Sequence, residues 1–142
     1  MGFDTAPLIY FIERHPDYFD RMLFIMQYVD GGLVAGLSAS IALTEVLVQP
    51  IRNGNNDLVG RYEAVLTRSR HFRLEPVTAG VARRAAELRA RYNLRTPDAL
   101  HVAAALESGC DAFLTNDSGI KRVSELRVLV LDDLELEPPG DT

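Results

Sequence analysis

Short apolar segments alternate with longer segments of helical periodicity along the chain. The clearest helical pattern is 78–92, where Val81, Ala85, Leu88 and Tyr92 form one stripe and charged residues form the opposite one. Helical spacing, caps and stop signals predict the other elements in the same way. The predicted helices are a segment reaching Glu13 after a strand that ends near Phe3, and 17–30, 40–51, 57–67, 78–92 and 96–108; the predicted strands are 33–38, 72–77, 112–115 and 128–131.

The segment 96–108 differs from the other predicted helices because it is apolar almost all round. Thr96 is expected as its N-cap, with Pro97 in the first turn and Asp98 behind it, and Gly109 ends it. A helix without a polar face is buried on all sides. We therefore expect it at the centre of the fold.

Short apolar strands that alternate with helices predict right-handed crossovers and a mostly parallel sheet covered on both faces. The fold class is α/β. No repeat or long linker interrupts the pattern, so 1–136 is expected to form a single domain and 137–142, rich in proline and glycine, a frayed tail.

Composition excludes several classes of protein. The 14-residue stretch without charge, 31–44, is shorter than the about 20 apolar residues that a bilayer requires, so no membrane span is expected. The first 30 residues show no basic leader followed by an apolar run. A single cysteine, Cys110, forms no intramolecular disulfide and no CxxC pair, which indicates a reducing compartment, most simply the cytoplasm.

The net charge of −5 argues against generic nucleic-acid binding, but the charge is unevenly distributed. Residues 61–95 hold nine arginines and three acids, whereas the flanking segments are acidic. A cationic band in an acidic protein can lie along a polyanion while the acids serve another purpose. The alternative is an ordinary solvated helix face.

Four acids stand at the ends of predicted strands or near a helix start. Asp4 follows the first strand, Asp117 follows 112–115, and Asp98 opens the central helix. Glu45 lies on the stripe of Ile41, Thr44 and Val48, which is expected to face the core, where an ionised carboxylate needs a partner. Taken singly, Asp4 and Asp117 could be caps and Asp98 a helix-dipole residue.

Ligands of open α/β sheets bind beyond the carboxyl ends of the strands, which is where these acids are expected to meet. Two charges 4 Å apart repel by about 4 kcal/mol at an effective dielectric of 20, so protons or a divalent cation must balance them. An all-oxygen site suits Mg²⁺ or Mn²⁺. Such an ion activates water and stabilises charge on a phosphate, so phosphodiester hydrolysis is the natural chemistry.

Four motifs carry a resemblance to a known family: Asp4-Thr5, Thr44-Glu45-Val46-Leu47, Thr96-Pro97-Asp98-Ala99-Leu100-His101 and Phe113-Leu114-Thr115-Asn116-Asp117. They resemble the acidic motifs of PIN domains, and most closely those of VapC-type ribonuclease toxins. The resemblance implies a three-layer α/β/α domain, a Mg²⁺- or Mn²⁺-dependent endoribonuclease that acts on RNA, a homodimer, and a small antitoxin partner.

By motif match, the resemblance implies that Asp4, Glu45, Asp98 and Asp117 form the catalytic and metal-binding set. Hydrogen-bond partners of these acids are then expected among Thr5, Thr115 and Asn116. Two departures affect Asp4: only three residues precede it, and Ala6 stands where a polar residue often follows.

Further residues are assigned with alternatives open. Arg83, Arg84 and Arg91 are candidates for positioning an RNA backbone, and otherwise form surface ion pairs. His101 either contacts phosphate or is a satisfied histidine beside the core. Seven of the eleven aromatic residues lie in the first 30, where they either cover the sheet or form a dimer or antitoxin surface near the first two helices.

Two other functions compete with the nuclease. A catalytically inactive PIN-like module could bind RNA or protein and use its acids only as caps. A phosphatase of the Asp-x-Asp type is disfavoured because Ala6 stands where the second aspartate would be.

Overall fold

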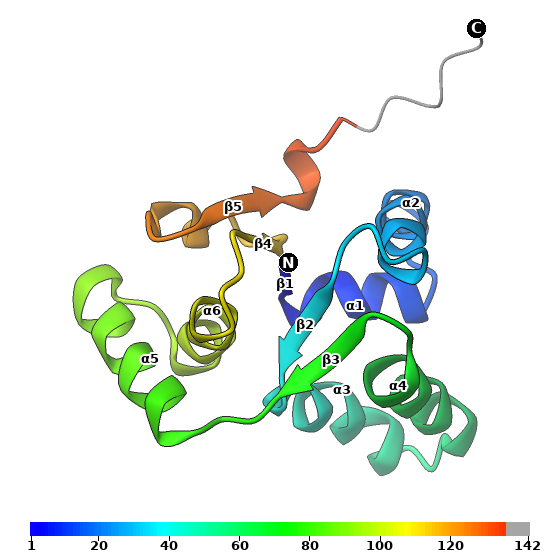
Figure 1. Ribbon diagram of the computed structural model, residues 1–142. Coiled ribbons are helices and arrows are strands. Elements are labelled where there is room, and N and C mark those ends of the chain that lie inside the picture. The colour runs from blue at the N-terminus through cyan, green and yellow to red at the C-terminus, as the bar shows by residue number, and fades with distance from the viewer. Residues whose placement is uncertain (136–142) are drawn as a thin grey trace, which may run out of the picture.

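A computed structural model describes residues 1–135, so the expected tail at 137–142 lies outside the described residues. Within this range, five strands alternate with helices (Figure 1). The strands are β1 (Gly2–Phe3), β2 (Gly36–Ala39), β3 (Phe72–Glu75), β4 (Ala112–Thr115) and β5 (Arg127–Val130). The α-helices are α1 (Thr5–Ile12), α2 (Phe19–Asp30), α3 (Ile41–Arg52), α4 (Asn56–Arg68), α5 (Ala79–Tyr92) and α6 (Thr96–Glu107), and two 3₁₀ helices are η1 (Ser118–Arg122) and η2 (Leu131–Asp133).

All strand pairings in the sheet are parallel, and the strand order is β3-β2-β1-β4-β5. The chain builds outward from β1 through β2 to β3, then returns to the other side of β1 to add β4 and β5. The order therefore reverses between β1 and β4, where open α/β sheets bind their ligands. This arrangement confirms the expected α/β class and makes the sheet wholly parallel.

Two hydrophobic cores cover the two faces of the sheet, so the fold has three layers (Figure 1). Helices α5 and α6 pack on one face, and α1 to α4 on the other. Helix α6 is central as predicted, because seven of its twelve residues are buried, from Asp98 to Ala105. A Cβ added at Gly2 of β1 would stand 2.6 Å from the Cβ of Ala105, so a glycine is needed there for this close approach.

Three predicted element boundaries are wrong, each for a local reason. The helix predicted at 17–30 begins at Phe19, because the N–H groups of Tyr18 and Phe19 bond to the His15 carbonyl in a preceding turn. The strand predicted from residue 33 begins at Gly36, because the N–H groups of Leu33 and Val34 bond to Tyr28 and continue around the end of α2.

The third difference is at α6, where Thr96 is the first helical residue and not the N-cap. Arg95 takes the cap position with extended backbone angles, and its side chain makes no capping hydrogen bond. The other predicted and observed ends agree to within two residues. Among the helices of residues 1–135, none has both the length and the apolar character needed to cross a membrane.

Candidate active site at the strand-order reversal

The reversal between β1 and β4 brings two of the predicted acids to one edge of the sheet. Asp4 follows β1 directly, and its backbone N–H donates to the Leu114 carbonyl of β4 at 2.8 Å. Asp117 lies two residues beyond the end of β4. The carboxyl ends of these paired parallel strands therefore fix where the two acids stand.

The Asp4 carboxylate is partly buried and held by two donors. It accepts the Thr5 backbone N–H at 2.8 Å, which caps α1, and the Thr115 hydroxyl at 2.8 Å. The same Thr115 oxygen accepts the Asp117 backbone N–H at 3.0 Å, so Thr115 links the two acidic segments. Burial raises the pKa of Asp4 above its usual value despite these donors, and the charge of Asp98 raises it further.

Glu45 does not face the core as the stripe of Ile41, Thr44 and Val48 predicted. Helix α3 buries Ala42, Val46 and Pro50 instead, and the Glu45 side chain is 36% exposed. The helix is apolar around most of its circumference, so the pattern alone did not determine which face is buried. Glu45 reaches the site from the rim of α3.

Two side chains from other elements orient the Glu45 carboxylate. The Thr5 hydroxyl donates to its Oε1 at 3.0 Å, and His101 Nε2 lies 2.6 Å from the same oxygen. The Thr5 hydroxyl has one hydrogen, which it donates to Glu45. Because the ionised Glu45 carboxylate can only accept, Nε2 of His101 must carry a hydrogen and donate it to this carboxylate. The hydrogen bond from His101 lowers the pKa of Glu45, which stays ionised.

His101 is buried, with a side chain 1% exposed, one turn beyond Asp98 on α6. Its Nε2 also lies 3.0 Å from the Thr5 hydroxyl, and its Nδ1 lies 3.5 Å from the Ser38 hydroxyl. Ser38 itself donates to the Phe3 carbonyl at 2.9 Å. His101 therefore has a partner at each ring nitrogen and contacts Glu45 from the buried side of the site.

Asp98 is buried at the start of α6 and paired with Arg95. The guanidinium donates through Nε to Asp98 Oδ2 at 3.0 Å and through Nη2 to Oδ1 at 3.3 Å. The hydrogen bonds that Arg95 donates to Asp98 raise the pKa of Arg95, and the charges of Asp117 and Asp4 raise it further. The positive charge of Arg95 also contributes to the low pKa of Glu45. One guanidinium is thus bonded to Asp98 and near enough to affect the pKa of other groups at this edge through its charge.

The remaining two candidates point elsewhere in this structure. Asp117 is exposed and accepts the Gly119 backbone N–H at 2.8 Å, which caps η1. The Asn116 amide lies 3.5 Å from the Tyr10 hydroxyl and accepts the Asp132 backbone N–H at 3.0 Å. Among the described residues, Asn116 has no hydrogen bond to any of the four acids.

The donor chemistry at this edge fits a hard divalent cation, because it consists of carboxylate and hydroxyl oxygens without thiolates. The arrangement seen here is not an assembled metal centre. Within residues 1–135, no three Asp, Glu, His or Cys side chains are placed so that they could hold one metal ion. Each of the four carboxylates is instead bonded to a group of its own chain.

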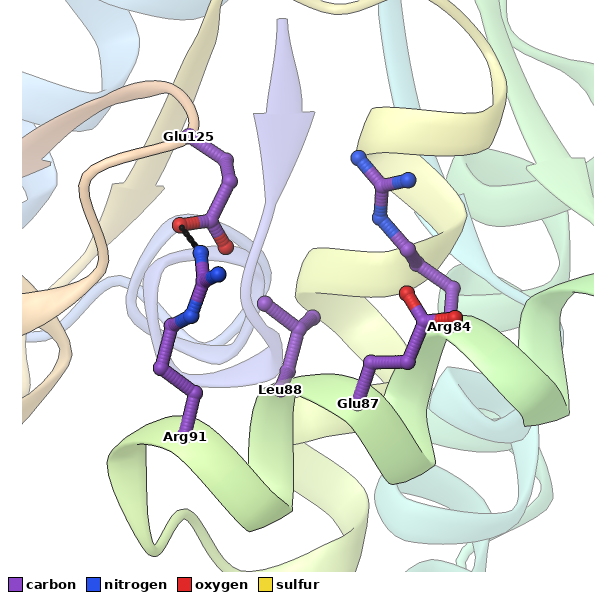
Figure 2. Close-up of a pocket in the computed structure, with 5 residues that line it drawn as sticks. All are labelled: Arg84, Glu87, Leu88, Arg91 and Glu125. Carbon is purple, nitrogen blue, oxygen red and sulfur yellow. Dashed lines mark hydrogen bonds and ion pairs between the residues drawn. The ribbon is translucent and has the colours of Figure 1, made fainter.

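The three arginines predicted to position RNA lie on α5, each beside an acid. Arg83 lies 3.7 Å from Glu87, Arg84 lies 3.9 Å from Glu107, and Arg91 donates to Glu125 at 3.2 Å. Arg84 and Arg91 flank Leu88 in a cavity of about 350 Å³, whose other walls are Glu87 and Glu125 (Figure 2). Their charges are compensated locally, so contact with RNA would require them to exchange these acids for phosphates.

Comparisons with known proteins agree with this fold. The sequence model of the PIN domain family matches residues 2–126. Among solved structures, the fold is similar to VapBC2 from Rickettsia felis bound to a DNA fragment from its promoter, with a TM-score of 0.71, 18% identity, and coverage of 90% of this chain and 96% of that one. It is also similar to a toxin–antitoxin complex from Klebsiella pneumoniae, with a TM-score of 0.68, 20% identity, and coverage of 91% and 95%. Curated proteins gave no match.

The chain therefore belongs to the PIN domain family. PIN domains are in general nucleases that use divalent metal ions. The family resemblance drawn from the four acidic motifs is confirmed, and so is the three-layer architecture that it implied.

Sequence reasoning missed two residues of the site, Arg95 and Ser38. Arg95 could have been found, because it lies three residues before Asp98 at the spacing of a helical ion pair. It also places a cation at a helix N-terminus, where the dipole disfavours positive charge. Ser38 gave no such signal, because its contact with His101 joins segments 63 residues apart.

Proposed function

We propose that this chain is a divalent-metal-dependent endoribonuclease of the VapC type, the toxin of a toxin–antitoxin pair, acting in the cytoplasm. One observation carries the proposal: in this PIN-family chain, Asp4 and Asp117 stand just beyond the paired parallel strands β1 and β4, at the reversal of strand order. Thr5 bonds to both Asp4 and Glu45 at the same edge of the sheet. Asp4, Glu45, Asp98 and Asp117 would hold one or two Mg²⁺ or Mn²⁺ ions. A bound ion supplies water activation at neutral pH and neutralises charge on the phosphate.

The chain's own residues orient these ligands. His101 and Thr5 hold the Glu45 carboxylate, and Thr115 holds that of Asp4. Partners of this kind fix the direction of a ligand and raise its basicity. We assign Arg83, Arg84 and Arg91 to the RNA backbone, where phosphate contacts set the position of the substrate without reading sequence.

Cleavage of RNA with and without Mn²⁺ or Mg²⁺ tests the proposal. Asp98→Asn keeps the shape of the side chain and removes its charge, so we expect the rate to fall by at least about 100-fold, as expected when transition-state charge loses its counterion. Asp57→Asn is the matched control, since Asp57 lies on α4 in an exposed pair with Arg61. Equal cleavage by wild type and Asp98→Asn would refute the proposal, and EDTA should abolish the activity.

The non-catalytic module remains the second candidate, because each acid already has a partner in the chain and none of the described residues form a ready metal centre. That function predicts no binding of Mn²⁺ in a calorimetric titration. It also predicts that amide substitutions at Asp4, Asp98 and Asp117 are tolerated without loss of RNA or protein binding.

For partners, we propose a homodimer and an antitoxin bound near α1 and α2. The toxin–antitoxin assemblies among the similar structures support the kind of partner. In this chain, most of the aromatic residues of the two helices stack in pairs, as Tyr10 does on Tyr18 and Phe11 on Phe19, while Tyr28 is 42% exposed. Exposed aromatic surface of this kind is typical of interfaces.

A further inference from the structure

Arg95 occupies an unusual place for a cation. It stands at the cap position of α6, where the helix dipole favours negative charge, and its side chain is 78% exposed. Other helix ends of the chain use polar or acidic caps, such as Asp4, Asn55 and Thr78. The acids around Arg95 are what make this position tolerable for a guanidinium.

The backbone before α6 keeps Arg95 within reach of these acids. Asn93 ends α5 in the left-handed conformation, and Leu94 is buried in the core beneath the turn. Arg95 is therefore anchored at its Cα, while its long side chain is free to move. Among the hydrogen bonds of the described residues, only the two to Asp98 hold the guanidinium.

The contact between Arg95 and Asp98 uses the carboxylate oxygens that a bound cation would need. Both oxygens of Asp98 accept hydrogen bonds from Arg95, in the forked geometry that matches a guanidinium to a carboxylate. The Asp98 side chain is only 11% exposed, so little of its surface remains open to another cation. A divalent ion that approaches this carboxylate therefore competes with Arg95 for its oxygens, and its charge repels the guanidinium.

We propose that Arg95 is a tethered counterion that competes with the divalent cation for Asp98, and so lowers the affinity of the acidic site for metal. The inference rests on the proposed function, in which Asp98 is a metal ligand. In this structure Arg95 neutralises the charge of Asp98, and a cation bound at Asp98 would displace the guanidinium from it.

The exchange is feasible because the pair is exposed on the arginine side. Exposed ion pairs contribute little to stability, and salt screens them. A divalent ion carries twice the charge and binds carboxylate oxygens directly. The competition therefore reduces the affinity without preventing binding.

Titration of the metal-free protein with Mn²⁺ by calorimetry tests the inference without any measure of activity. We expect Arg95→Gln to bind Mn²⁺ about three- to tenfold more tightly than wild type, because the competing pair is lost. Arg95→Lys keeps the charge but not the fork, and should lie between the two. Arg61→Gln removes the same charge from an ion pair on α4 and should bind like wild type.

Thermal melts give a second readout. At a fixed concentration of Mn²⁺, the rise in melting temperature should be larger for Arg95→Gln than for wild type, because tighter binding stabilises the folded state more. Circular dichroism establishes that each variant is folded; if Arg95→Gln fails to fold, the comparison of Arg95→Lys with Arg61→Gln decides.

The outcomes separate the two proposals. If wild type binds Mn²⁺, Asp98→Asn does not, and Arg95→Gln binds no more tightly than wild type, the counterion inference is wrong and the proposed function stands. If neither wild type nor Arg95→Gln binds Mn²⁺, the proposed function fails and the inference falls with it. If wild type binds Mn²⁺ and Arg95→Gln binds it more tightly, the result supports both the proposed function and the counterion inference.

Discussion

At the scale of the residue, the carboxylates of Asp4, Glu45 and Asp98 each accept hydrogen bonds from donors of the same chain. Thr115 and the Thr5 N–H engage Asp4, the Thr5 hydroxyl and His101 engage Glu45, and Arg95 engages Asp98. Each donor reduces the repulsion among the carboxylates and fixes the direction of their oxygens. Orientation and charge compensation are thus performed by the same contacts.

Asp4 is expected to destabilise the fold at neutral pH. Its pKa is raised in the fold by burial, so the stability it contributes is present below its unfolded pKa of 3.8 and is lost as the pH rises through the raised value. We expect Asp4→Asn to increase the free energy of unfolding at pH 7 by about 1 kcal/mol, as is common when a functional charge is removed.

Urea denaturation at several pH values checks this expectation. The difference in free energy of unfolding between Asp4→Asn and wild type should shrink as the pH falls toward 3, because Asp4 is then protonated and uncharged, as asparagine is. Asp57→Asn, at an exposed position, serves as the control. A variant less stable than wild type at pH 7 would contradict the argument from burial.

His101 should act through Glu45. His101→Leu keeps the buried volume but removes the donor at 2.6 Å from Glu45 Oε1, so the affinity for Mn²⁺ should fall by about 10- to 100-fold, as when other supporting partners of metal ligands are removed. His101→Gln can still donate from its amide and should recover much of the affinity. Equal Mn²⁺ binding by both variants, measured by calorimetry, would assign His101 a purely structural role.

The candidate acids could be found in the sequence, but most of their partners could not. Asp4 and Asp117 follow strands, and Asp98 lies in the first turn of a helix. Turn and cap signals in the sequence predict such positions. The bond between Thr5 and Glu45 joins residues 40 apart, and the pair of Asp4 and Thr115 joins residues 111 apart. Contacts of this range depend on the strand order, which local patterns do not contain.

At the scale of the element, β1 is the critical strand, because its two residues lie between β2 and β4 and lead straight into Asp4. On the face of the sheet that α6 covers, β1 has almost no free space at Gly2, because Ala105 and Phe113 lie against it. Any displacement of β1 would move Asp4 relative to Thr115. The strand therefore couples core packing to the site.

Gly2→Ala should destabilise the protein by about 1 to 3 kcal/mol through overpacking against α6. Its Cβ would stand 2.6 Å from the Ala105 Cβ, a side-chain atom that cannot rotate away. Gly60→Ala on α4 is the matched control: it meets open space and should stabilise by about 0.5 to 1 kcal/mol. Chemical denaturation measures both, and a Gly2→Ala variant as stable as wild type would contradict the packing argument.

Helices differ in how far the sequence could place them. Helix α6 was predicted to be central because it has no polar face, and it is. Helix α3 also has apolar side chains around most of its circumference, yet it lies at the surface with Val48 and Ile51 exposed. Apolar side chains indicate that a helix is partly buried, but the elements that pack against it determine which face is buried.

At the scale of the whole molecule, charge is divided between the acidic edge of the sheet and the arginines of α5. Replacing Arg83, Arg84 and Arg91 together with alanine should weaken RNA binding and make its dependence on salt shallower, by about 2 in the slope of log K against log salt. Binding is measured in an Asp98→Asn background, in which RNA is expected to stay intact. An unchanged slope would remove these arginines from the RNA surface, and Arg61→Ala is the control.

Because α6 is enclosed by its neighbours and carries Asp98 and His101 on successive turns, its amides should be among the slowest to exchange with deuterated solvent. Opening this helix would require the core on its face of the sheet to come apart. Mild denaturant should therefore abolish the site only together with cooperative unfolding of the domain, and not in an earlier local transition.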